Sequence, residues 1–307
     1  HRRIVATGCR PVGRRGSGQV TNSLEQLPNF VRDAYRLKPS SPFAPEDTRL
    51  GSYTFLSSVQ SGIGAVVTAP GGGALRAQIN VSLPVQAEGL GDLAVSQALE
   101  VRGPGDVIGI DEGQIIRRYP TPHTTNAEDT FLVHVEFDRP ELPWLFSPKA
   151  QTGIPWLVLV VLADGRWTPR AGVPGLPAQV DTFLGELQPL GDVSQWAHAQ
   201  LIGPATTGPS IDDRLTNAYA PVNLSRLLCP RRLEPDRQYL ACVVPYYDAG
   251  RQTALDTGIL GTLEPAWARR PDGSDRDTAI TLPVYSSWRF GIGPDGDFGS
   301  LAKKLLG

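Results

Sequence analysis

Proline recurs along the whole of this chain, and its distribution limits the fold more than any other feature. The 28 prolines among 307 residues are scattered, without a repeat of fixed period. Proline fixes φ and lacks a backbone N–H, so it interrupts helices and shortens strands. The 33 glycines add turns and bends between the prolines. The sequence therefore predicts a mainly β, α+β fold, with short-stranded sandwich or barrel-like domains, a few short helices and long Pro/Gly loops.

Strict alternation of apolar residues predicts a β-hairpin in the first half of the chain. Residues 77–85 are apolar at every second position, the pattern of a half-buried strand. Residues 88–92 have turn composition, and residues 93–101 return with strand composition. The three segments together predict two antiparallel strands joined by a tight turn.

Other segments have the composition of strands or of short helices. Residues 156–162 are apolar on both faces, which favours a central strand. Further strands are predicted at residues 107–110, 131–137, 239–244 and 280–290. Short helices are predicted at residues 23–37, 180–187, 224–228, 249–255 and 298–306.

We expect three regions along the chain. Residues 1–45 have the composition of an extended N-terminal arm with one short helix, followed by a β-rich domain at 46–165 and a second β-rich subdomain at 166–307. The sequence starts at His1, contains no methionine and ends within a predicted helix. These features favour a portion of a longer polypeptide.

The overall charge excludes a dedicated nucleic-acid or anionic-membrane binder. Net charge is −2 with a pI near 6.1, so no global field attracts polyanions. Arg2, Arg3, Arg14 and Arg15 form short basic clusters in the arm, and we expect them to contact a partner protein. No apolar run approaches the ~20 residues that a membrane-spanning helix needs.

The three cysteines favour buried free thiols. Cys9, Cys229 and Cys242 have no metal-finger or redox-motif spacing, and their odd number argues against a disulfide framework. A Cys229–Cys242 disulfide is the alternative.

His134, Glu136 and Asp138 make the sharpest chemical constellation in the sequence. They alternate with Val133, Val135 and Phe137, so a strand would place all three on the face opposite these apolar residues. The first interpretation is an ordinary solvent-facing side of a half-buried strand. The alternative is the centre of a metal-dependent hydrolase, with His123 as a further ligand from a nearby loop.

Motifs of other catalytic classes are missing from the sequence. It contains no Gly-x-Ser-x-Gly elbow, no phosphate-binding Gly-x-x-x-x-Gly-Lys motif and no regular Ca²⁺-binding spacing, so we predict no cofactor and no catalytic residue. The acidic clusters at 106–112 and 272–277 have the composition of turns. The six tryptophans favour core packing, with a carbohydrate- or surface-binding module as the alternative.

Several segments, taken in order, resemble a family of large, uncharacterised bacterial proteins of actinobacteria-like and other high-GC genomes. The resemblance is carried by residues 53–56, 103–111, 115–118, 136–148, 155–161, 225–231 and 282–285. Members tend to lie near genes for phage-tail-like particles such as contractile injection systems. The resemblance implies no activity and no site residues.

These observations together predict a non-enzymatic structural or adaptor subunit of a phage-tail-like or other multi-subunit particle, such as a baseplate component. Its expected partners are other protein subunits, copies of itself included, with no nucleic acid and no membrane span. Assembly is expected in the cytoplasm, with release in an extracellular particle left open.

Overall fold

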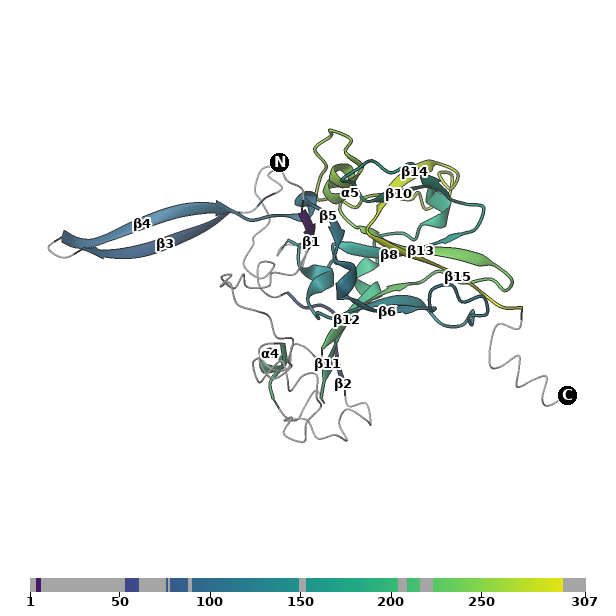
Figure 1. Cartoon of the computed structure of the whole chain (residues 1–307), viewed down its shortest axis with the longest axis horizontal. Helices are drawn as coiled ribbons and strands as arrows, with labels where there is room; N and C mark the ends of the chain where they lie inside the picture. The colour runs from purple at the N-terminus through teal and green to yellow at the C-terminus, as the bar shows by residue number, and fades with distance from the viewer. Residues whose placement is uncertain are drawn as a thin grey trace, which may run out of the picture.

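A computed structural model describes residues 4–6, 53–60, 76, 78–87, 90–148, 153–203, 209–215 and 223–294. Figure 1 shows a body of small sheets from which one long hairpin projects. The fold is mainly β with short helices, as the proline distribution predicts. The predicted helices at 23–37 and 298–306 lie outside the described residues, as does most of the N-terminal arm.

The largest sheet has five antiparallel strands in the order β2-β11-β12-β7-β6. Its strands are β2 (Tyr53–Leu56), β11 (Ala197–Ile202), β12 (Leu224–Cys229), β7 (Val133–Phe137) and β6 (Ile115–Tyr119). Residues along β11 and β12 alternate between buried and half-buried, so one face of the sheet packs on the core and the other is open.

A second sheet forms the centre of the hydrophobic core. It has the order β15-β13-β8, with β15 (Ser286–Gly291), β13 (Gln238–Pro245) and β8 (Leu157–Ala163). Every residue of β8 is buried, as the apolar run predicts. The prediction that this run is a central strand is wrong, however, because β8 pairs only with β13 among the described strands.

Side chains complete the free edge of β8 in place of a neighbouring strand. Gln188 Nε2 donates to the carbonyl of Leu159 (2.8 Å), and Arg231 Nη1 donates to the carbonyl of Val161 (2.9 Å). The amide of Ala163 donates to Glu186 Oε2 (3.2 Å). A buried strand edge needs partners for its polar groups, and these three contacts supply them from within the chain.

A third sheet has the order β14-β10-β9 and continues directly into the second. It comprises β14 (Ala279–Val284), β10 (Ala178–Phe183) and β9 (Thr168–Arg170). The single strand predicted at residues 280–290 is thus two strands that meet at Tyr285. The amide of Tyr285 donates to Val243, and its hydroxyl donates to Val107 in β5 (Val107–Ile110).

Helices are short throughout the described chain. The α-helices are α4 (Ile211–Leu215) and α5 (Asp248–Leu255), and α5 confirms the helix predicted at 249–255. Single 3-10 turns are η3 (Pro104–Asp106), η4 (Glu112–Gln114), η5 (Leu142–Trp144), η7 (Leu184–Glu186) and η8 (Val193–Trp196). No helix in the described part is long and apolar enough to cross a membrane.

One of the predicted helices is a strand, and another is half strand and half 3-10 turn. Residues 180–187 contain the end of β10 and η7, because Val180 pairs with both Leu282 and Pro169. Residues 224–228 lie in β12, between β11 and β7. In both segments, pairing with distant strands overrides a weak local preference for helix.

Strands from both predicted β-rich regions share the sheets. β7 and β8 come from residues 46–165, yet they pair with β12 and β13 from residues 166–307. One cluster of buried apolar residues includes side chains from both regions. Position 165 therefore lies in a turn between β8 and β9, and buried side chains from both sides of it belong to one core.

The projecting hairpin consists of β3 (Gln78–Ala87) and β4 (Leu90–Glu100), which confirms the predicted strand pair. A further short strand, β1 (Ile4–Ala6), pairs in parallel with β5. Figure 1 shows β3 and β4 extending away from the body along their whole length.

Candidate functional site

The open face of the five-stranded sheet carries the residues singled out for metal chemistry. His134 and Glu136 lie on β7, opposite the fully buried Val133 and Val135, as the alternation predicts. Asp138 follows the end of the strand and is exposed. The strand therefore presents two of the three candidate ligands.

Glu136 is engaged by arginine. It is only 4% exposed, so it is not a solvent-facing residue as the first interpretation supposed. Its Oε1 accepts a hydrogen bond from Arg226 Nε at 2.6 Å, and Arg117 Nε lies 3.8 Å from Oε2. Arginine thus occupies one oxygen of this carboxylate and lies near the other.

Arg226 connects Glu136 with the next strand of the sheet. Register places Arg226 between Glu136 on β7 and His198 on β11. Its Nη1 donates to Gln200 Oε1 at 2.6 Å and lies 3.4 Å from His198 Nε2. Burial lowers the pKa of His198, and the charge of Arg226 lowers it further. This row of side chains is thus a satisfied polar network that ties three strands together.

The remaining metal candidates do not complete a site. His134 contacts the carbonyl of Leu132 through Nδ1 and stacks on Tyr119, with ring centroids 5.2 Å apart. His123 lies in a separate loop, where its amide donates to Arg289. Partial desolvation at the end of β7 raises the pKa of Asp138, and the charge of Glu141 adds to this shift. Within the described residues, no three His, Cys, Asp or Glu side chains gather closely enough to hold a metal ion.

Both cysteines that the structure describes are buried free thiols, which confirms the prediction for Cys229 and Cys242. Burial raises the pKa of Cys229 to about 11 and raises that of Cys242 as well. Each thiol is therefore protonated at neutral pH, and neither has the thiolate that nucleophilic catalysis needs. Cys9 lies outside the described residues.

The tryptophans pack in the core or at its margin. Trp144, Trp156, Trp267 and Trp288 are buried, and Trp167 and Trp196 are half-buried. Trp156 Nε1 donates to the carbonyl of Leu142 at 2.7 Å. This confirms core packing for the four buried rings, and the guanidinium of Arg289 lies over the ring of Trp167.

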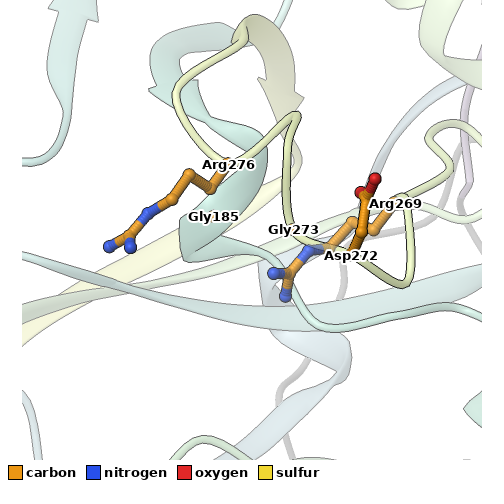
Figure 2. Close-up of a pocket in the computed structure, with 5 residues that line it drawn as sticks. All are labelled: Gly185, Arg269, Asp272, Gly273 and Arg276. Atoms are coloured by element: carbon orange, nitrogen blue, oxygen red, sulfur yellow. The ribbon is translucent and has the colours of Figure 1, made fainter.

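A surface pocket of about 340 Å³ lies beside η7, lined by Gly185, Arg269, Asp272, Gly273 and Arg276. The amide of Gly185 donates to the carbonyl of Arg276, and a Cβ at Gly185 would meet that oxygen at 2.7 Å. Figure 2 shows the two guanidinium groups well apart and the Asp272 carboxylate pointing away from both. The pocket lacks the convergent polar groups that fix a ligand.

The acidic clusters serve as turns and anchors. Asp111 accepts a hydrogen bond from the amide of Gly113, and Asp272 accepts one from that of Ser274. The carboxylate of Asp106 accepts hydrogen bonds from Arg76 and from the amide of Gly103. Arg76 lies just before β3. Burial acts to raise the pKa of Asp106, but these hydrogen bonds outweigh it and the pKa is lowered. Asp106 therefore fixes the base of the projecting hairpin to the body.

The hairpin itself presents an unusual surface. On one face, Leu83 is 61% exposed, Leu99 49% and Val95 47%. The described side chains on this hairpin include one charge, that of Glu100 at its base. Contiguous exposed apolar surface is a candidate for an interaction site. The alternation of residues 77–85 predicted the strand, but it could not indicate that its apolar face lies outside the core.

Sequence reasoning missed the arginines that organise the structure. Arg226 and Arg231 lie in or near a segment predicted as helix, and neither was singled out. The alternation of apolar and polar residues from Leu224 to Cys229 was the available signal for Arg226. The predicted partner-binding residues Arg2, Arg3, Arg14 and Arg15 lie outside the described residues.

Comparison with known proteins yields no relative for this chain. No family model, no curated protein and no solved structure matches it.

Proposed function

We propose that this chain is a non-enzymatic structural or adaptor subunit of a multi-subunit particle and acts through protein–protein contacts. The observation that carries the proposal is the projecting hairpin β3–β4, with its exposed aliphatic side chains. A monomer gains nothing from holding such a surface in water, whereas a subunit of an assembly uses it for contact.

The state of the chemically suggestive residues supports the same proposal. Glu136 is paired with Arg226, and the thiols of Cys229 and Cys242 are buried and protonated. In the described chain, the groups best suited to chemistry are therefore committed to holding the fold. The metal-dependent hydrolase and the carbohydrate-binding module have no comparable observation in their favour.

A phage-tail-like particle is the assembly that we propose. This choice rests on the resemblance of residues 53–56, 103–111 and 136–148, with the later segments in the same order, to bacterial proteins associated with such particles. In this proposal the chain assembles inside the cell, with the N-terminal arm and its arginines contacting neighbouring subunits.

The test is incorporation into particles in cells that naturally produce the chain. High-mass particles are sedimented, and the chain is quantified by mass spectrometry against the other subunits. We expect a constant ratio for the wild type. A variant in which residues 80–98 are replaced by Asn-Gly, so that the pair Ile79–Leu99 closes a short turn, should remain in the supernatant.

The control for this experiment is Asp138→Asn, which removes an exposed candidate ligand of the alternative hydrolase and leaves the hairpin and the Glu136–Arg226 pair intact. We expect it to enter particles like the wild type. Wild-type protein that is present in the cells but missing from every high-mass fraction would overturn the proposed function.

A further inference from the structure

The hairpin β3–β4 is amphipathic, and its apolar face is uncovered. The register pairs Ile79 with Leu99, Val81 with Gln97 and Leu83 with Val95, so these six residues share one face. Five of the six are aliphatic, and all but the half-buried Ile79 are exposed. The opposite face carries small or polar residues, among them Asn80, Ser82, Ser96 and Ala98.

The apolar face of such a hairpin is stable only when another layer packs on it. An isolated two-stranded hairpin is marginally stable in water, and strands gain stability when an apolar face packs on another layer. Among the described strands, β3 and β4 pair only with each other. Edge strands of stable monomers are normally protected by charges, prolines or bulges. The described side chains of β3 carry no charge, and its Pro84 and the irregular register between Val85 and Ala87 lie toward the tip of the hairpin.

The described surface of the body offers no strip that matches this face. Its exposed large apolar residues lie on separate elements, as Phe55 does on β2, Ile116 on β6, and Ile259 and Leu260 after α5. The one described surface of this chain with a long, uncharged and aliphatic face is the hairpin itself. A second copy of the chain therefore supplies a layer of the same length and chemistry.

We infer that the apolar face of β3–β4 packs against the same face of a second copy, forming a two-layer, four-stranded contact related by a two-fold axis. Stacked sheets pack about 10 Å apart, with their inner side chains interdigitated. Because the hairpin extends away from the body in Figure 1, two copies can lie antiparallel with their bodies at opposite ends. This inference rests on the proposed function, because the inferred second copy is one partner of the assembling subunit.

The size of the face sets the strength of this contact. The ten-residue β3 is roughly 34 Å long, and a two-stranded ribbon is about 10 Å wide, so each copy contributes at most roughly 350 Å². This lies below the ~800 Å² per partner of a standard stable interface. The dimer should therefore be reversible in solution, and further contacts within a particle would strengthen it.

The test is sedimentation velocity of the purified full chain over a range of concentrations. We expect a monomer–dimer equilibrium in the wild type. Leu83→Asp places a charge in the contact twice, because a two-fold interface uses each residue from both copies. If each of the two charges weakens dimer affinity tenfold, the dimer affinity falls about 100-fold. The matched control is Ser82→Asp, which adds the same charge on the opposite face and should change the affinity less than about threefold.

Three results would overturn the inference. The first is a wild type that stays monomeric at the highest soluble concentration, and the second is an equal effect of both variants. The third is co-sedimentation of monomeric protein with phosphatidylcholine vesicles that is lost in Leu83→Asp, since this would assign the face to lipid. A wild type that is monomeric alone but enters particles would leave the proposed function standing and assign the hairpin to a different protein subunit.

Discussion

Strand β8 and the hairpin β3–β4 are both rich in aliphatic residues, but their surroundings are opposite. All seven residues of β8 are buried, and side chains of Gln188, Arg231 and Glu186 occupy its free edge. The hairpin leaves both its apolar face and its outer edges uncovered. Side chains of the body thus cover the free edge of β8, whereas no described element covers the apolar face of the hairpin.

The largest effect that this comparison predicts comes from Leu159→Ala. Leu159 is 1% exposed in β8, and truncating a buried leucine in a packed core leaves a cavity. We expect the free energy of unfolding to fall by about 2–5 kcal/mol, measured by chemical denaturation. The dimer affinity of the folded variant should be unchanged.

The matched substitution is Leu83→Ala on the hairpin. At a protein concentration where the chain is monomeric, its free energy of unfolding should stay within about 0.5 kcal/mol of the wild type. Similar losses for the two leucines would show that the hairpin packs within its own chain.

A smaller loss is expected when the edge of β8 is opened by Arg231→Ala. Glu186 accepts from Arg231 at 2.7 Å, and its side chain is only 10% exposed. The variant leaves this carboxylate with Arg166 and the amide of Ala163 as donors, and it leaves the carbonyl of Val161 without its side-chain donor. We expect about 2–4 kcal/mol less free energy of unfolding by chemical denaturation.

The control for the edge is Arg170→Ala. Arg170 and Asp181 are 3.6 Å apart, with side chains 54% and 44% exposed. An exposed pair of this kind contributes at most about 1 kcal/mol. If both variants lose the same stability, the side chains at the edge of β8 are ordinary surface contacts.

The smallest predicted effect is a pH dependence of the free energy of unfolding, which Glu186 causes. Burial acts to raise the pKa of Glu186, but Arg231 and the other donors outweigh it, and the pKa is lowered from 4.5. A carboxylate with a lowered pKa stabilises the fold above its unfolded pKa, and this stabilisation is lost as the pH falls through the folded pKa. Glu186→Gln should therefore be less stable than the wild type at pH 7.

Below pH 4.5 the difference in free energy of unfolding between Glu186→Gln and the wild type should shrink, as denaturation curves at several pH values would report. A constant difference down to pH 3 would mean that the carboxylate charge contributes nothing. The dimer affinity should not follow this pH dependence, because the apolar face of the hairpin carries no titratable group.

Much of the local structure could be predicted from the sequence, because strand periodicity is a local property. The alternation at 77–85 predicted β3, and the apolar runs at 156–162 and 239–244 predicted β8 and β13. Failures came where local patterns were weak. Residues 180–183 and 224–228 are strands because distant strands pair with them.

In the candidate site, too, local features could be predicted and long-range contacts could not. Alternation placed His134 and Glu136 together on one face of β7. It could not reveal Arg226, which lies 90 residues further along the chain and binds Glu136. A contact between residues so far apart depends on the order of strands in the sheet, which no local spacing reports.

The sequence by itself determined that this protein is built of short strands and which side of each strand is apolar. Proline density and alternation decide these features, since both act through the backbone of neighbouring residues. Only the tertiary structure decided what covers each apolar side. In β8 the cover is the core of the same chain, and in the hairpin no described element provides it, because burial depends on strand pairings between residues far apart in the sequence.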